Sequence, residues 1–463
     1  MTATKYLVSL TFYHAMFNSF VVLMAKSFKE KMKKELFRLW LIVLCGGLFS
    51  CSTSEDLSHE TVVNMLSDPQ PIELTANQKI FVNDNNSFSL NFFKTVNESG
   101  DNNKSMIYSP LSIVFVLGMV NDAATGVTEE ELEKTLGFHN GGIKAVNDYC
   151  KSLINKLPKV DKDVHLDIAN AIFVNKDFSL KKPYQQDMST YYDASAESLD
   201  FSASSSLNHI NDWCNKKTNG MINKILDKIS PMAISYLLNA IYFKADWTSK
   251  FDKKMTKNEA FTTPNGNRKQ PIMHQEVFIR YQQNDTFSAV DIPYGNGLWC
   301  MTVMLPEKGK TTDDIINKLA ADGWGSTNYS NTMGDARPYQ IDLKLPRYET
   351  SSDTDDLPGS LIDMLKAMGI NKVFTTEAEL PNLCQERNDV YISMMRQKAK
   401  ILVNEEGSEA AAVTVAETRM TSALPSEPEV IPKANFHATR PFVYLIREKS
   451  SGVILFVGKY TGE

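Results

Sequence analysis

The sequence EEGSEAAAVTVA, at residues 405–416, is the most informative stretch of the chain. In an extended strand, alternate residues face opposite sides. One face of this strand would carry only small side chains, those of Ser408, Ala410, Ala412, Thr414, Ala416 and Thr418. The other face would carry every charge, with Glu409, Glu417 and Arg419 beside Ala411, Val413 and Val415. A strand with one small, uncharged face can enter an existing sheet without displacing its neighbours or burying a charge.

Prolines follow this stretch directly, at Pro425, Pro428 and Pro432. A proline has no backbone N–H to donate to a sheet ladder, so strand pairing is interrupted there. We therefore predict a strand-competent segment that leads into an exposed loop. The alternative is an ordinary surface strand followed by a proline-rich linker.

The rest of the chain alternates between predicted strands and helices. Residues 165–174 (HLDIANAIFV) and 233–243 (AISYLLNAIYF) are rich in branched and aromatic residues, which predicts core strands. The YGNG sequence at 294–297 lies between two apolar runs and is the strongest hairpin signal. Two further apolar strands are predicted at 441–446 and 453–457.

Four helices are predicted upstream of the hairpin. Residues 86–96 have apolar positions in helical spacing. An almost wholly apolar run follows Ser109, which is placed as its N-cap, so this helix must be buried. Thr128, with Glu131 three residues later, has the pattern of a capping box for the next helix. A fourth helix is predicted over residues 213–225.

Composition predicts one large globular body and excludes several classes of function. The chain has 463 residues, 43% of them hydrophobic, and a net charge of −6, which argues against nucleic acid as a partner. Seven histidines show no metal-ligand spacing, and no G-x-S-x-G or phosphate-binding loop is present. We therefore expect no metal, no cofactor and no catalytic activity. Four of the six cysteines lie far apart and are expected to be buried free thiols: Cys150, Cys214, Cys300 and Cys384.

The N-terminal region has the order of residues found in a secretory signal. Met32 is followed by basic residues, an apolar stretch at 39–44, two glycines and Cys51. The apolar stretch is too short to span a bilayer. The end of this segment resembles a lipobox, in which Cys51 is acylated, although Phe49 is bulkier than the usual residue at its position. The alternative is a plain signal peptide that is cleaved elsewhere.

These features divide the chain into four parts. We expect residues 1–31 to be an upstream mis-start, 32–50 a lipoprotein signal peptide, 51–76 a polar tether and 77–463 the folded domain. This division predicts a protein of the cell envelope, anchored by lipid to the outer membrane and either periplasmic or exposed at the cell surface. The membrane would be contacted only through the lipid anchor.

Five segments resemble the serpin family in wording, order and spacing over residues 77–463. They are SPLSI at 109–113, NAIFV at 170–174, WCNKKTNGMI at 213–222, LLNAIYFKADW at 237–247, and RPFVYLIREKSSGVILFVGK at 440–459. The resemblance implies an α+β serpin fold with three β-sheets, about eight or nine helices and an exposed reactive-centre loop. It also implies a monomer.

The resemblance assigns roles to individual residues. The hinge of the loop would comprise Glu405, Gly407, Ser408, Glu409, Ala410, Ala411 and Ala412. The bond cut by a protease would be Thr421–Ser422, with Arg419 and Met420 as alternative positions. The region where the sheet opens would include Ser109, Ser112, Asn239 and Trp247, with Gln397 where many serpins have a histidine. Thr439 also departs from the family pattern, where Asp or Asn is more usual.

The function implied is that of a protease inhibitor. A serine protease would cut the loop and form a covalent acyl-enzyme, and the freed hinge would insert into the central sheet. A cysteine protease is an alternative target. The competing interpretation is a non-inhibitory serpin with a binding or chaperone role. Such members typically have bulky, charged or proline residues in the hinge, whereas residues 408–412 here are small apart from Glu409 on the charged face.

Overall fold

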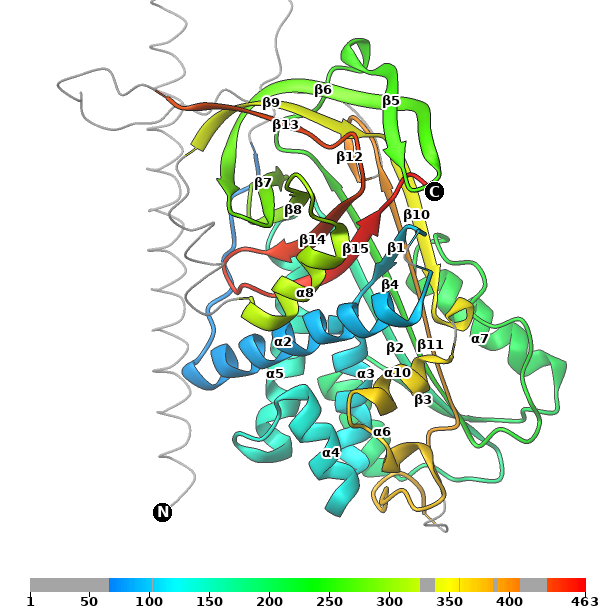
Figure 1. The fold of residues 1–463 in the computed structure, drawn as a ribbon. Helices are drawn as coiled ribbons and strands as arrows, with labels where there is room; N and C mark the ends of the chain where they lie inside the picture. The colour runs from blue at the N-terminus through cyan, green and yellow to red at the C-terminus, as the bar shows by residue number, and fades with distance from the viewer. Residues whose placement is uncertain (1–65, 102, 325–337, 358, 386–389, 409–430) are drawn as a thin grey trace, which may run out of the picture. The chain divides into compact units, whose positions relative to one another are not determined.

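The computed structural model describes residues 66–101, 103–324, 338–357, 359–385, 390–408 and 431–463 (Figure 1). Within these residues the chain forms helices and two hydrogen-bonded sheet networks, which confirms the α+β class. The α-helices are α2 (Ala76–Ser99), α3 (Pro110–Ala123), α4 (Gly126–Leu136), α5 (Gly142–Lys156), α6 (Lys182–Tyr191), α7 (Ser204–Lys217), α8 (Thr312–Asp322) and α10 (Leu361–Ala367).

The central sheet has six strands and contains both strands predicted at 165–174 and 233–243. Its order is β10 (Tyr348–Asp353), β11 (Met394–Val403), β4 (Ser235–Asp246), β2 (His165–Asn175) and β3 (Ser195–Leu199), with β12 (Gly407–Ser408) also paired to β4. β4 is antiparallel to β2 but parallel to β11. Alternate side chains of β2 and β4 face opposite ways, so one face packs against α7 and the other against the main core, which includes α3.

The second network has nine strands and contains the predicted hairpin and C-terminal strands. Its order is β1 (Met106–Tyr108), β15 (Ile454–Tyr460), β14 (Phe442–Glu448), β8 (Trp299–Pro306), β7 (Phe287–Tyr294), β6 (Gly266–Gln283), β9 (Pro338–Pro346) and β13 (Lys433–His437), with β5 (Lys257–Thr263) on β6. The expected three sheets therefore appear as two networks. The long strand β6 pairs with β5 and β9 along most of its length and with β7 at its end, which joins two of them.

The ladder between β4 and β11 is incomplete. It runs only from the pair Met394–Tyr236 to the pair Lys398–Ala240, although both strands continue further. At the far end of β4 its edge is paired instead with β12, which runs antiparallel to it. The central sheet is therefore closed at one end and divided at the other, and β12 lies at the divided end.

Three helix predictions need correction. α2 begins at Ala76 rather than near residue 86, because Thr75 and Gln78 form a capping box. α4 is preceded by Thr125 as its N-cap, so the capping box predicted at Thr128 is wrong. The Thr128 hydroxyl instead accepts a hydrogen bond from the backbone N–H of Glu379, at 3.0 Å.

The helix predicted over residues 213–225 is also wrong. α7 starts earlier, at Ser204, and ends at Lys217. Asn219 and Gly220 have positive φ angles of 49° and 82°, which an α-helix does not accommodate. Residues 218–234 therefore form an irregular connection between α7 and β4.

Residues 66–75, which were predicted as part of a tether, pack against the folded body. Ser67 and Ile72 are buried. The Ser67 hydroxyl donates to the Asp161 carboxylate at 2.5 Å, and the Ile72 N–H donates to the Ser450 hydroxyl at 2.8 Å. Asp161 also accepts from the N–H of Asn296 at 2.6 Å, so this segment is linked to the turn between β7 and β8.

The four described cysteines are free and buried, as predicted: Cys150, Cys214, Cys300 and Cys384. Burial raises the pKa of the first three thiols to about 12 and that of Cys384 to about 11. Cys45 and Cys51 lie outside the described residues. Within the part of the chain that the structure describes, no helix is long and apolar enough to cross a membrane.

Candidate functional site

The hinge begins in a defined conformation at the divided end of the central sheet. Gly407 pairs with Asp246 and Ser408 with Ala245, and both hinge residues are buried. Gly407 has a φ of 152°, and a Cβ at this position would lie 2.1 Å from the carbonyl oxygen of Ala245. Only glycine can therefore bring the chain this close to β4.

Two carboxylates fix the residues just before Gly407. Glu405 is 2% exposed and accepts hydrogen bonds from Arg347 and from the Thr256 hydroxyl. Burial would raise the pKa of Glu405, but these two hydrogen bonds outweigh it and hold the pKa below its ordinary value. The adjacent Glu406 pairs with Lys253 at 2.8 Å and with Lys250 at 3.2 Å. The hydrogen bond from Lys253 is the main reason that the pKa of Glu406 is also lowered.

Trp247 closes the sheet beside the hinge. It is 2% exposed and stacks on Tyr294 with ring centroids 4.3 Å apart and an interplanar angle of 11°. Its indole N–H donates to the carbonyl of Asn404 at 2.9 Å, and its backbone N–H donates to that of Glu406 at 2.8 Å. The Tyr294 hydroxyl lies 3.0 Å from the Ser408 hydroxyl. The start of the hinge, β12, is thus held by an aromatic pair that joins the residue directly after β4 to the end of β7.

A second cluster lies where the β4–β11 ladder is still paired. The Gln397 amide contacts the backbone of Ser109 twice, accepting from its N–H at 3.0 Å and donating to its carbonyl at 2.8 Å. Ser109 is the N-cap residue of α3, as predicted, but its hydroxyl makes no capping bond and donates instead to the carbonyl of Leu455 at 2.7 Å. Ser112 lies 3.0 Å from the Ser109 hydroxyl.

Asn239 completes this cluster from β4. Its amide donates to the side chain of Asn170 on β2 at 2.9 Å, and it accepts from Gln397 at 3.5 Å. All of these side chains are buried and hydrogen-bonded. Because an amide does not ionise, Gln397 closes the sheet here without a charge that depends on pH.

The structure therefore brings the predicted site residues together in two groups. Glu405, Gly407, Ser408 and Trp247 form the first, and Ser109, Ser112, Asn239 and Gln397 form the second. The remaining predicted positions lie outside the described residues: Glu409, Ala410, Ala411, Ala412, Arg419, Met420, Thr421 and Ser422. Over the described residues, no group of three potential ligands could hold a metal ion.

Sequence reasoning missed several residues that contact the hinge or β11. Tyr294, Asn404 and Arg347 hold the hinge, and Arg396 forms a buried ion pair on β11. Arg396 could have been noticed, because an arginine within a strand that alternates with apolar residues requires a partner. The others depend on contacts between distant parts of the chain and carry no local signal.

Substituting Gly407 by alanine should displace β12 from β4. We expect Gly407→Ala to lower the free energy of unfolding by about 1–3 kcal/mol, because the added Cβ overlaps the backbone of β4. Thermal unfolding followed by circular dichroism would measure the change. Gly452→Ala is the matched control, since Gly452 also has a positive φ, of 79°, but has no atom within 4 Å of an added Cβ. Equal destabilisation by both variants would contradict close approach at Gly407.

The contacts of Glu405 with Arg347 and Thr256 should weaken in acid. Glu405 has a pKa below its ordinary value of 4.5, so its stabilising effect is present above that pH and is lost as the pH falls through the folded pKa. We expect the melting temperature of the wild-type protein to fall more between neutral pH and about pH 3 than that of Glu405→Gln. Glu349→Gln, which removes an exposed pairing with Lys400, is the control. Parallel curves for the wild type and Glu405→Gln would show that Glu405 contributes nothing to acid sensitivity.

Comparisons with known proteins agree with this arrangement. A family model described as serpin (serine protease inhibitor) matches residues 83–462. An uncharacterized serpin-like protein of Thermococcus kodakarensis is 30% identical over 82% of this chain and 85% of its own length. Human serpin B3 is 30% identical over 81% of this chain and 98% of its own length.

Solved structures show the same fold. A thermophilic serpin, tengpin, in its native state matches with a TM-score of 0.71 and 26% identity, over 86% of this chain and 97% of its own. Serpins are in general inhibitors of proteases rather than catalysts, and their partners are in general the proteases that they bind. From the match to the family model and the relatives that share it, the chain belongs to the serpin family.

Proposed function

We propose that this serpin is an inhibitor of serine proteases that acts as a suicide substrate. The observation that carries the proposal is the start of a new strand at the divided end of the central sheet. β12 is already paired antiparallel to β4, and β11 is not paired with β4 at that level. The residues that follow β12 alternate between a small face and a charged face. Continuing β12 along β4 would therefore fill the space between β4 and β11.

Insertion can supply the energy that trapping requires. About a dozen residues, at about 1 kcal/mol net for each backbone hydrogen bond, would contribute on the order of ten kcal/mol. The protease attacks the loop carbonyl and forms an acyl-enzyme, which is the first half of its own reaction. Insertion then pulls the attached enzyme and deforms its oxyanion hole, so that deacylation slows and the complex persists.

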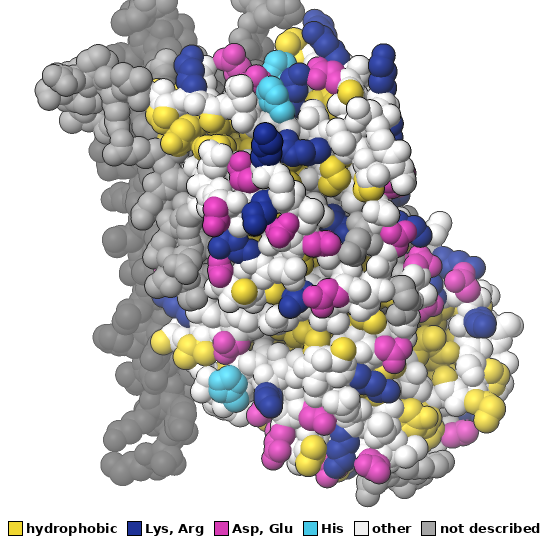
Figure 2. Space-filling model, viewed as in Figure 1, with side chains coloured by type: hydrophobic (Ala, Val, Ile, Leu, Met, Phe, Trp, Pro, Cys, Tyr) yellow, Lys and Arg dark blue, Asp and Glu magenta, His cyan; other side chains and the backbone are white. Residues whose placement is uncertain are grey.

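The residues near the expected bond allow more than one class of target. Thr421 suits an elastase-like pocket, Arg419 a trypsin-like pocket, and Met420 a chymotrypsin-like serine protease or a cysteine protease. On the face shown in Figure 2, basic and acidic side chains are interspersed, so this face offers no charged surface that would favour one of these classes.

Trapping should depend on which face of the hinge is small. We expect the wild-type protein, mixed with elastase, trypsin or subtilisin, to form a covalent complex that survives boiling in SDS. Ala410→Glu places a charge on the small face of the hinge strand, which insertion would bury. This variant should be cleaved as a substrate without trapping the protease. Ala411→Glu places the same charge on the opposite face and should still form the complex. Gel electrophoresis and mass spectrometry of the released peptide would measure complex formation and the bond cut.

The result that would overturn this proposal is cleavage by every protease without a stable complex. That outcome would favour the alternative, a non-inhibitory serpin with a binding or chaperone role. Complexes formed equally by both hinge variants would instead contradict the proposed orientation of the inserted strand.

We further propose that Cys51 is lipidated and attaches the protein to the outer membrane. The basic, apolar and small residues that precede Cys51 support this proposal. We expect Cys51→Ser to move the protein from the detergent phase to the aqueous phase in phase partitioning, whereas Cys45→Ser should have no effect. Mass spectrometry should find acyl chains on Cys51 as the first residue of the mature protein, and an unmodified N-terminus elsewhere would indicate a plain signal peptide.

A further inference from the structure

The connection between α7 and β4 is fixed to both of these elements. The Asn211 side chain on α7 accepts from the N–H groups of Ile225 and Leu226 at 2.9 Å and donates to the carbonyl of Leu226 at 2.9 Å. Further along, the Ser230 N–H donates to the hydroxyl of Tyr236 on β4 at 2.8 Å. The connection therefore belongs to the β4 side of the divided sheet.

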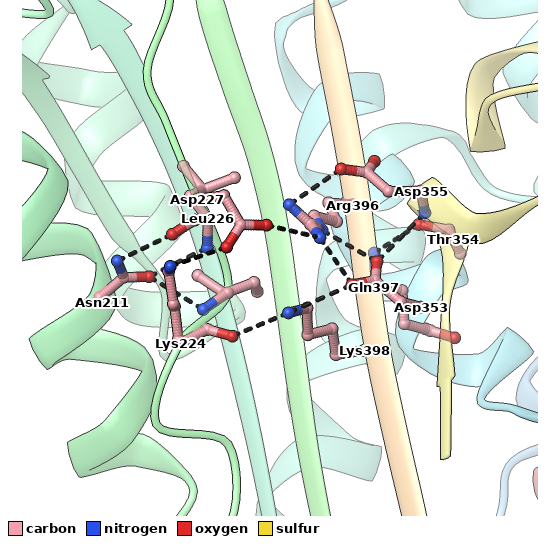
Figure 3. A network of polar contacts seen from close by, with 11 residues as sticks. Asn211, Lys224, Leu226, Asp227, Asp353, Thr354, Asp355, Arg396, Gln397 and Lys398 are labelled. Atoms are coloured by element: carbon pink, nitrogen blue, oxygen red, sulfur yellow. Dashed lines mark hydrogen bonds and ion pairs between the residues drawn. The ribbon is translucent and has the colours of Figure 1, made fainter.

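Arg396 on β11 contacts carboxylates from two parts of the fold (Figure 3). Its side chain is 6% exposed, and its guanidinium pairs with both oxygens of Asp353, at 2.9 and 2.6 Å. It also contacts Asp355 at 2.8 Å and Asp227 at 3.6 Å. Asp227 lies in the connection, and Figure 3 shows its side chain directed across the ribbon of β4 toward Arg396.

These carboxylates differ in which side of the sheet they belong to. Asp353 ends β10 and pairs in register with Lys398 of β11, and Asp355 lies in the following 3-10 turn, so both would move with β11. Asp227 would stay with β4. A strand placed between β4 and β11 separates them by about 4.8 Å more, which an ion pair at this distance cannot span.

We propose that Asp227 is a positioning residue for insertion, which holds β11 through Arg396 and slows entry of the hinge strand. The contact exists only while the sheet is closed, so it stabilises the protein before insertion and not after it. This inference rests on the proposed function. Asp227 is exposed on 64% of its side-chain surface, so the effect on the insertion rate should be modest, about two- to fivefold.

A second contact between β11 and the connection limits how much the loss of Asp227 can raise the insertion rate. The Lys398 ammonium donates to the carbonyl of Lys224 in the connection at 2.9 Å. It remains when Asp227 is changed. The ion pair, unlike a hydrogen bond to a carbonyl, should also weaken as salt screens its charges, which gives a second measurable property.

The test compares two neutralised partners of the same arginine. In the full chain, solubilised in detergent, an environment-sensitive fluorophore on Ala411→Cys would report insertion after mixing with an excess of the protease that forms a complex. Asp227 also pairs with Lys224 at 2.8 Å, but both residues lie within the connection. We expect Asp227→Asn to insert about two- to fivefold faster than the parent protein and to be accelerated less than the parent between about 0.05 and 1 M salt. Asp355→Asn, which removes a contact on the β11 side, should insert at the parent rate.

Other outcomes would separate the inference from the proposed function. If the parent inserts and Asp227→Asn inserts at the same rate, or if Asp355→Asn is accelerated equally, the inference is wrong and the proposed function stands. If the parent shows neither insertion nor a complex with any protease, the proposed function is wrong and the inference with it. Melting temperatures provide the control for general destabilisation: if Asp355→Asn lowers the melting temperature as much as Asp227→Asn does but does not insert faster, destabilisation alone does not explain the rate change.

Discussion

The rest of this structure depends on one unmade set of hydrogen bonds, those between β4 and β11 beyond Lys398. β4 and β11 both continue beyond this point, but their facing edges are not hydrogen-bonded to each other there. Side chains of both strands still pack into the core. Unpaired strand edges are a liability in most proteins because they accept other strands. Here the edge of β4 is partly occupied by β12, so the chain supplies the start of its own filling strand.

Two kinds of contact hold this arrangement in place, and they differ in chemistry. At the hinge, charged groups and an aromatic stack fix the backbone of residues 404–408 against β4. At the end where the ladder is intact, Gln397 and Asn239 close the sheet with neutral amides. The first set responds to pH and salt, whereas the amide contacts of the second do not. At the paired end, solution conditions act through the ion pairs of Arg396 rather than through these amides.

Much of the fold could be predicted from the sequence because its strands carry strong local patterns. The segments rich in branched and aromatic residues at 165–174 and 233–243 and the YGNG turn correspond to β2, β4 and the β7–β8 hairpin. Helix boundaries were less predictable, because the capping box at Thr75 and the positive φ at Asn219 depend on local geometry that periodicity does not report. The site was predictable in part, from the alternation of small and charged residues in the hinge and from the family resemblance. The Glu405–Arg347 pair was not, since nothing near either residue indicates the other.

The four buried cysteines have a consequence for where such a protein can operate. A disulfide forms through the thiolate, and burial keeps these thiols protonated and out of contact with oxidants. The four described thiols are therefore protected from disulfide formation as long as the protein stays folded. Among the described residues no disulfide holds the central sheet closed, so its resistance to opening comes from packing, hydrogen bonds and ion pairs.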